Sequence, residues 1–522
     1  MARTIFIFFF LCLATLSVKT KPIVNPQSYK HYIDSFNAND DELYRGAVPN
    51  SESWRFLSEN IPFFDCPDKA FERTYYFRWW TYRKHIKETP AGLVITEFLP
   101  DVPWAGKYNT ISCAAAFHYC EGRWLREQKP LDDYAAFWFR GGGSPRSYSF
   151  WAADAFYNRF LVTGDSAWIK ALLPDLVKNY QSWENEKLSP NGLFWQVDDR
   201  DGMEMSVCGS GYRATINSYM YGDALAIAAI ALLSGDKDLA DQYSEKAKKI
   251  KQAVENQLWD NQAEFFKVLP QDTNARLCTS RELHGYTPWY FNLPDSAYSS
   301  AWKFLPDSTY FFAPYGLTTV ERKSPGFRIS YEGHECQWNG PSWPYATSIT
   351  LTALANLLNN YSQSYISKED YFQLLKIYTE SQQLIREDGK AVPWIDENLN
   401  PFTGDWISRT RLKNWESGNW SKEKGGVERG KDYNHSTYCD LIISGLLGIR
   451  PREDNRLIVN PLIPNNVWNY FCLDHLKYHG REITIFYDQS GTRYKKGKGF
   501  FVFVAGKQVF HAKYIQKAMV SL

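Results

Sequence analysis

The sequence predicts a mainly α-helical protein: a two-layer toroid of helices, followed by a small C-terminal β region. Between residues 110 and 450, most segments with a clear hydrophobic period are helical, and long connections rich in Gly, Pro, Asn and Asp separate them. Several of these helices are apolar on nearly every side, as in DALAIAAIALL (223–233), which suits an inner helix packed on both faces. After Arg450, the segments RLIVNPLIP, EITIFYD and GFFVFVAGKQVF are β-rich and partly alternating, with turn residues between them.

Hydrophobic spacing and flanking turn residues indicate where the individual helices lie. The expected helices are, in order, Ile111–Trp124, Ser147–Val162, Trp168–Glu184, Ile216–Leu233, Asp238–Leu258, Tyr345–Leu358, Lys368–Ile385 and Ser436–Leu447. The segment from Tyr75 to Pro103 is ambiguous between strand and helix, and no repeat of fixed period is visible. We therefore divide the chain into a signal peptide (1–20), an N-terminal segment (21–70), the helical barrel (71–450) and a C-terminal β-rich region (451–522).

The first residues are typical of a secretory signal peptide. Arg3 precedes an apolar run from Ile5 to Val18, and the polar sequence KTKP follows it. The run is shorter than the roughly 20 residues that a membrane-spanning helix needs, although a retained N-terminal anchor is the alternative. We therefore expect a secreted protein, extracellular or periplasmic, with no membrane span after the signal is removed.

Charge and composition exclude several classes of partner. The 59 basic and 58 acidic residues nearly cancel, and no basic run exceeds the short cluster at 495–498, so no nucleic-acid partner is expected. No Gly-rich nucleotide loop or clustered His/Cys pattern points to a cofactor or a metal ligand set, while a structural calcium stays open. Apart from Cys12, eight cysteines remain, an even number compatible with disulfides in an oxidising compartment. Cys113 and Cys120 would stand about 10.5 Å apart along a continuous helix, too far to bridge each other.

Four loop segments combine tryptophan with carboxylates or amides: FWFRGGGSPRS (137–147), FWQVDDRDGMEMS (194–206), HECQWNGPSWP (334–344) and PWIDENLNPFTGDW (393–406). Sugars need such surroundings, because their C–H faces pack on aromatic rings while their hydroxyls bond to carboxylates, amides and guanidinium groups. Hydrolysis of a glycosidic bond also needs two carboxyl groups, one protonated to assist departure and one ionised. The loops of a helical toroid gather around a pocket at one end, which favours carbohydrate binding over four unrelated clusters of core tryptophans.

Three of these segments carry a resemblance to a known family. The stretch DGMEMSVCGSGYRATINSYMYGDALAIAAIA (201–231) resembles the SGMDNSP region of the six-hairpin glycosidases related to glycoside hydrolase family 63 and mannosylglycerate hydrolase. QWNGPSWP (337–344) is similar to their GP.WP loop, and ENLNPFTG (397–404) to their E.YNP.TG loop, in the family order. The resemblance covers roughly residues 70 to 450. It implies an (α/α)6 barrel that hydrolyses a glycosidic bond of an oligosaccharide or polysaccharide, usually alpha-linked and with inversion.

The resemblance also implies the catalytic pair. Its base position falls on Glu397, which would activate water, and its acid position falls on Glu204. The family has Asp at the acid position, so Glu204 is a departure: the longer side chain moves the proton by about one C–C bond. Asp198, Asp199 and Asp201 are the alternatives for the acid, and their like charges would help a neighbouring carboxyl to keep its proton. A solvated acidic loop and a simple turn before Pro401 are the competing interpretations.

The remaining candidates are substrate-binding residues. They are Asp201, Arg146, Glu335, Gln337, Trp338 and Trp343, with Trp79, Trp80 and Trp104 as further sugar platforms and Arg140 beside the glycine loop. Glu335 is also the rival to Glu397 for the role of base. Each tryptophan has core packing as its alternative, and the arginines have a structural role in holding the loop.

Two functions from other classes stay open. The segment KDYNHSTYCD (431–440) places Tyr433, Asn434 and His435 in a row, which are residue types that toroidal polysaccharide lyases use. Neighbouring side chains of an extended segment alternate, so the three cannot all face one pocket. A barrel that has lost catalysis and only binds carbohydrate is the second alternative, and the Glu at the acid position is compatible with it.

Overall fold

The structure is a computed structural model that describes residues 22–522 except 273–275, 335, 414–425 and 427. The expected signal peptide lies outside these residues. The α-helices run as follows: α1 Lys30–Ala38, α2 Ser53–Asn60, α3 Lys69–Lys84, α4 Ser112–Gly122, α5 Lys129–Arg140, α6 Ala152–Thr163, α7 Ser166–Lys187, α8 Ala214–Leu233, α9 Lys237–Gln257, α10 Thr287–Tyr290, α11 Pro344–Asn360, α12 Lys368–Ser381 and α13 Ile407–Lys413.

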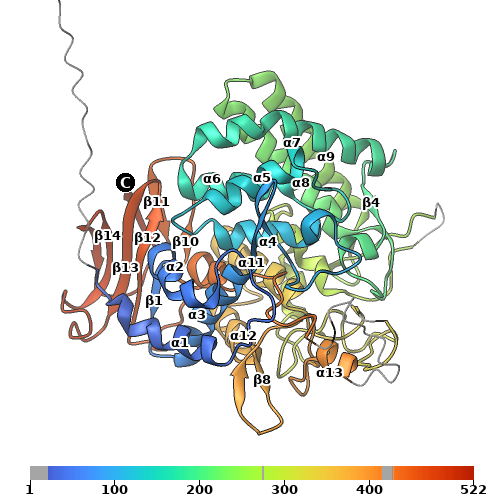
Figure 1. Ribbon diagram of the computed structural model, residues 1–522. Helices are drawn as coiled ribbons and strands as arrows, with labels where there is room; N and C mark the ends of the chain where they lie inside the picture. The colour runs from blue at the N-terminus through green and yellow to red at the C-terminus, as the bar shows by residue number, and fades with distance from the viewer. Residues whose placement is uncertain (1–21, 273–275, 335, 414–425, 427) are drawn as a thin grey trace, which may run out of the picture.

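The helices from α3 onward form an (α/α)6 barrel, which confirms the predicted fold class (Figure 1). Helices α4, α8 and α11 are buried on nearly every side, whereas α5, α7, α9 and α12 keep an exposed polar face. The first group therefore supplies the inner layer and the second the outer layer. Among the described residues, α8 is the one helix long and apolar enough to cross a membrane, and 72% of its most apolar window is buried inside the protein.

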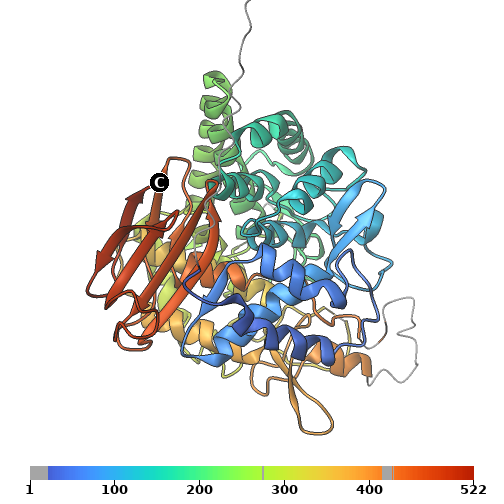
Figure 2. The same ribbon diagram turned by 60° about the vertical axis from the view of Figure 1, so that its left-hand side comes forward.

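The longer strands lie together at one side of the barrel (Figures 1 and 2). They form a five-stranded antiparallel sheet in the order β1-β12-β13-β14-β15 and a three-stranded sheet in the order β10-β11-β16. Their bounds are β1 Phe63–Asp65, β10 Ile449–Arg450, β11 Arg456–Val459, β12 Tyr470–Tyr478, β13 Arg481–Asp488, β14 Gly499–Val504, β15 Lys507–Ala512 and β16 Ala518–Ser521. Because β1 pairs with β12, the N-terminal segment and the C-terminal β region share one sheet.

Four short hairpins project from the helical part: β2 Ile86–Thr89 with β3 Gly92–Ile95, β4 Trp195–Gln196 with β5 Gly211–Tyr212, β6 Trp259–Asp260 with β7 Phe265–Phe266, and β8 Gln383–Ile385 with β9 Ala391–Pro393. The ambiguous segment after Tyr75 thus contains both the end of α3 and the hairpin β2–β3. The helix expected to continue to Ile385 stops at Ser381, because the backbone there enters β8.

Two other expected helices differ from the observed ones. The helix expected from Ser147 begins at Ala152, because Ser149 instead bonds through its backbone N–H to Arg200 in the loop opposite. The segment after Ser436 forms only a short π-helix, Leu441–Leu446. Its preceding backbone N–H groups, at residues 438–440, donate to the buried Glu121 carboxylate of α4.

Candidate active site

A cavity with an empty volume of about 500 Å³ lies at the end of the barrel where the long loops meet. Residues from six separate stretches line it, and most of them are aromatic or carry a carboxyl group. They are Glu97, Phe98, Trp104, Ile111, Cys113, Tyr148, Gly202, Glu204, Cys336, Trp338, Trp343, Tyr345, Glu397, Arg429, Tyr433 and His435. The structure therefore brings the two expected catalytic carboxyls, Glu204 and Glu397, into one cavity.

Glu204 follows a short 3-10 turn, Asp199–Asp201, and Gly202 in the left-handed conformation with φ of 70°. Met205, the next residue, also has a positive φ of 61°, which is uncommon for a side-chain-bearing residue and turns the chain sharply. Burial, together with the nearby carboxyls of Asp199 and Glu397, raises the pKa of Glu204 to about 8. A carboxyl in these surroundings keeps its proton at neutral pH.

Glu397 has different surroundings on the same cavity wall. Its Oε1 accepts a hydrogen bond from the Arg429 guanidinium, and both side chains are at most 2% exposed. Its Oε2 lies 3.8 Å from the thiol sulfur of Cys336. The guanidinium thus gives the buried Glu397 carboxyl a partner of opposite charge.

Trp338 and Trp343 form one apolar wall of the cavity. Their rings stack with centroids 4.6 Å apart and planes inclined by 17°, and the indole N–H of Trp343 donates to the Gln337 carbonyl at 2.9 Å. Trp104 lines the same cavity and is 38% exposed. Trp79 and Trp80 lie instead in the core along α3.

Three further lining residues are Glu97, which the sequence analysis did not single out, and Tyr433 and His435, which it named only for lyase chemistry. Glu97 follows β3, and its Oε1 accepts a hydrogen bond from the Tyr433 hydroxyl. The ring of Tyr433 packs edge-on against His435 at 3.7 Å. Asn434 points away and donates to the Thr96 carbonyl at 3.2 Å. The predicted alternation of this segment is thus confirmed, and the amide that a lyase would need is not at the cavity.

Several predicted binding residues lie elsewhere. Asp201 is fully buried in a separate cluster, where it pairs with Arg213 at 2.7 Å and accepts from the Ser149 hydroxyl at 2.6 Å. Arg146 lies on the outer surface and pairs with Glu186 at 3.1 Å. Their charges are taken up by these partners, so neither side chain contributes to the cavity described above. Glu335 falls outside the described residues.

The other candidates for the acid and for sugar binding also lie outside the lining. Gln337 is buried behind the tryptophan pair and donates to the Glu332 carbonyl at 2.8 Å. Asp198 accepts from the Ser210 hydroxyl at 3.0 Å, and Asp199 is half-exposed beside Arg200. Arg140, the last residue of α5 and part of the glycine-rich segment, pairs with Asp175. Of the acidic residues in the 198–204 loop, Glu204 is the one that reaches the cavity.

Backbone contacts link the loops that carry Glu204, the tryptophan pair and Glu397. The Trp338 N–H donates to the Glu204 carbonyl at 3.0 Å, and Ser342 and Leu399 exchange two backbone hydrogen bonds of 2.9 Å each. The loop bearing the tryptophan pair therefore lies between the loops of the two carboxyls and is bonded to both. A disulfide from Cys208 to Cys278 anchors the Glu204 loop on its other side.

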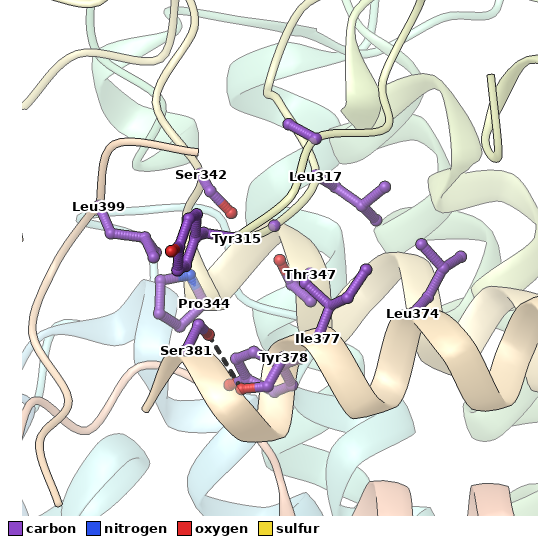
Figure 3. A pocket seen from close by; sticks show the side chains of 12 residues that line it. Tyr315, Leu317, Ser342, Pro344, Thr347, Leu374, Ile377, Tyr378, Ser381 and Leu399 are labelled. Carbon is purple, nitrogen blue, oxygen red and sulfur yellow. Dashed lines mark hydrogen bonds between the residues drawn. The ribbon is translucent and has the colours of Figure 1, made fainter. Parts of the chain in front are cut away.

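A second cavity, with an empty volume of about 320 Å³, adjoins the Ser342–Leu399 contact (Figure 3). Figure 3 shows Tyr315, Pro344 and Leu399 on one side of it, and Thr347 and Tyr378 from α11 and α12 on the other. None of the residues that line it carries a carboxyl group. Its lining therefore offers no pair of carboxyls.

Among the described residues, no group of three or more His, Cys, Asp or Glu side chains is arranged to hold a metal ion. Cys113 and Cys120 are both free and buried in α4, in line with the prediction that they do not bridge each other. The ionisable groups of the described lining are therefore three carboxyls, one guanidinium, one imidazole, two thiols and three phenol hydroxyls, one of which is bonded to Glu97.

Comparison with known proteins gives this arrangement a family. The model of the mannosylglycerate hydrolase MGH1-like glycoside hydrolase domain matches residues 107–436, which includes Glu204, Glu397 and the loop between them. The chain belongs to the MGH1-like glycoside hydrolase family. The C-terminal domain of glycosyl hydrolase family 65 matches residues 449–511, the strand-rich part. The resemblance deduced from the three loop motifs is thereby confirmed.

Individual relatives of this MGH1-like chain share the fold over different lengths. A solved structure named "Sialidase" is 43% identical, with a TM-score of 0.88, over 95% of this chain and 45% of that one. A family 78 rhamnosidase of Bacillus sp. GL1 has a TM-score of 0.53 at 10% identity, over 82% of this chain and 41% of that one, and shows the fold alone. An uncharacterized protein of Borreliella burgdorferi is 26% identical over 184 residues, which are 35% of this chain and 38% of that protein. The chain thus spans less than half of each of these relatives.

Proposed function

We propose that the protein is a secreted glycosidase that hydrolyses an alpha-linked O-glycosidic bond with inversion, with Glu204 as general acid and Glu397 as general base. The observation that carries the proposal is the contrast between two carboxyls in one cavity. Glu204 has a pKa raised to about 8 by burial and neighbouring carboxyls, whereas Glu397 is paired with Arg429. A carboxyl that keeps its proton, beside one that is paired with a cation, suits the acid and base roles of this reaction.

In the proposed reaction, Glu204 gives its proton to the glycosidic oxygen as the bond to the anomeric carbon breaks. A water held by Glu397 attacks the anomeric carbon from the opposite face and loses a proton to the carboxylate. Inversion needs the two carboxyls to stand roughly 6.5–9.5 Å apart, with the water between the sugar and the base. The stacked Trp338 and Trp343 give an apolar wall against which the sugar ring packs.

Secretion to an extracellular or periplasmic location is part of the same proposal. The Cys208–Cys278 disulfide supports it, because disulfides persist in oxidising compartments. The apolar run at Ile5–Val18 supports it from the sequence side.

A product screen tests the proposal. The mature protein and its Glu397→Gln variant would be incubated with plant, microbial and animal glycans, and the products resolved by chromatography and by NMR of the anomeric proton. Release of a saturated sugar in the inverted configuration by the wild type, lost in the variant, is the expected result. An unsaturated product would indicate lyase chemistry instead, and equal activity of the two proteins would remove Glu397 from the mechanism. Binding of a glycan without turnover would indicate a protein that has lost catalysis.

A further inference from the structure

The charged groups of the cavity are unevenly distributed. Among the described lining residues, Glu97, Glu204 and Glu397 supply three carboxyls, while Arg429 supplies the guanidinium. That guanidinium is already engaged by Glu397. A ligand that enters the cavity therefore meets carboxyl groups on several sides, and the positive charge on its wall is committed to one of them.

Glu97 is the carboxyl of the three that the proposed reaction does not use. It is buried, it lines the cavity, and one of its oxygens is bonded to the Tyr433 hydroxyl. Its other oxygen, Oε2, has no hydrogen-bond partner among the described residues. A buried carboxyl oxygen without a hydrogen-bond partner destabilises the folded protein unless another group bonds to it. At the wall of a substrate cavity, the substrate can make that hydrogen bond.

We propose that this cavity selects an uncharged, hydroxyl-bearing sugar over one that carries a carboxylate, and that Glu97, held by Tyr433, is the residue that makes the selection. This inference rests on the proposed function, because it names the class of sugar that the same site accepts. A sugar hydroxyl both donates and accepts hydrogen bonds, so it completes Oε2 of Glu97 whether that carboxyl is ionised or protonated. A sugar carboxylate can only accept, so it cannot bond to Oε2 of Glu97 once that carboxyl is ionised.

The rejection of carboxylated sugars follows from charge. A carboxylate brought into the cavity loses its water shell, and no described cation of the lining outside the Glu397 pair receives it. Burial raises the pKa of Glu97 and of Glu204 to about 8, so the same surroundings that keep these two carboxyls protonated disfavour the charge of a sugar carboxylate. A desolvated charge left without a partner is a recognised means of excluding a wrong ligand. Sialic and uronic acids carry such a carboxylate. We therefore expect no sialoside cleavage at this site, although one relative is named "Sialidase", a chain of which this protein spans 45%.

The test uses pairs of sugars that differ only in charge. Aryl α-glucoside is compared with aryl α-glucuronide, and aryl α-galactoside with aryl α-galacturonide, so that a CH2OH group is exchanged for a carboxylate at one carbon. An aryl α-mannoside and an aryl α-sialoside complete the set. For any pair that is cleaved, kcat/KM for the neutral member should exceed that of its charged partner by at least about 100-fold, a ratio that polar mismatches in buried sites commonly reach. A charged partner cleaved as well as the neutral one, or a cleaved sialoside, overturns the inference.

Two variants assign the selection to Glu97. Glu97→Gln keeps the shape and the acceptor for Tyr433 but cannot ionise, so the ratio between the members of a pair should narrow at least about tenfold, with a higher KM for the neutral sugar. Tyr433→Phe removes the hydroxyl that bonds to Oε1 of Glu97, and it should also narrow the ratio of kcat/KM between the neutral and the charged sugar. Glu88→Gln, exposed on the same β2–β3 hairpin, is the matched control and should leave the ratio unchanged. A purely structural role for Glu97 would alter both members equally, and an unchanged ratio in Glu97→Gln overturns the assignment.

Failure of this inference can be separated from failure of the hydrolase proposal. Binding of the free sugars to Glu204→Gln is followed by saturation-transfer NMR, because that variant leaves the Glu397–Arg429 pair intact. If the variant binds neutral sugars in preference to uronic acids and the wild type hydrolyses none of them, the selectivity stands and the proposed hydrolysis is wrong. Hydrolysis of uronides or sialosides would retain the reaction and discard the selectivity. Binding of no neutral sugar, or stronger binding of the acids, would overturn the inference directly.

Discussion

The Arg429 guanidinium donates a hydrogen bond to Oε1 of Glu397 inside the cavity wall, and it also lies over the ring of Trp104 with its central carbon 5.3 Å from the ring centre. The contact fixes a negative charge at a buried position that faces the substrate. Glu204, on the loop that is bonded to Trp338, has no such cation beside it among the described residues and keeps its proton. One ion pair thus distinguishes two carboxyls of the same chemical type, and the predictions below depend on it.

Replacing either carboxyl should strongly reduce turnover without unfolding the protein. For Glu204→Gln and Glu397→Gln we expect kcat to fall about 10²–10⁴-fold, the range that a general acid or base contributes. Steady-state kinetics on the substrate found by the product screen measures it. The exposed Glu186, paired with Arg146 on the outer surface, offers a control: Glu186→Gln should keep full activity. A tenfold or smaller loss in Glu204→Gln would point to another proton donor.

Removing the cation should cost stability as well as activity. Arg429→Met leaves the Glu397 carboxylate buried without its partner, a change that typically destabilises a protein by about 3–5 kcal/mol. Urea denaturation of the variant against the wild type measures the loss. The double variant Arg429→Met/Glu397→Gln should recover part of it, because the uncompensated charge is gone. Equal losses in the single and double variants would show that the pair is not what stabilises this wall.

The sequence alone predicts much of this fold, and particular residues show where it stops. Helix α8 was predicted because its apolar residues leave no polar face, and the strands after Arg450 because their residues alternate. The pairing of β1 with β12 was not predictable, since Phe63 and Asp474 come together only through the fold. Local patterns carry no information on such distant partners.

The site shows the same division. Glu204 and Glu397 were found because their loops resemble a family, and they do share a cavity. Asp201 carries the same chemical group three residues before Glu204, yet it turns inward to Arg213, because side-chain direction depends on the Asp199–Asp201 turn and Gly202. Glu97 was missed because it lies alone in an apolar stretch; an unexplained acid in ITEFLP was the signal that could have revealed it.

Activity should decline on the alkaline side as Glu204 ionises. Burial and neighbouring carboxyls raise the pKa of Glu204 to about 8, and the protonated form is the active one, so kcat/KM should fall as pH rises through about 8. Asp199→Asn removes one of the neighbouring charges, which lowers the pKa of Glu204 and moves the fall in kcat/KM to lower pH. Asp238→Asn, on the exposed start of α9, should not move it. If the alkaline fall in kcat/KM occurs at the same pH in Asp199→Asn as in the wild type, the ionisation of Glu204 is not its cause.

The Cys208–Cys278 disulfide should support the acid loop more than the rest of the protein. Cys208 lies four residues after Glu204, and the bridge closes a segment of 70 residues, so Cys208→Ser/Cys278→Ser should lose about 2–4 kcal/mol of stability. The backbone contact from Trp338 to the Glu204 carbonyl remains, so the loop keeps one anchor and loses the other. Glu204 would then sample positions away from the glycosidic oxygen, and kcat should drop by about tenfold or more, because catalysis is sensitive to displacements of about 1 Å. Denaturation and kinetics in the absence of reductant measure both effects.

Replacing the free buried Cys472 by Ala, far from the cavity in β12, controls for loss of a thiol and should leave kcat unchanged. A double variant that is less stable but fully active would show that the Trp338 contact alone positions the acid.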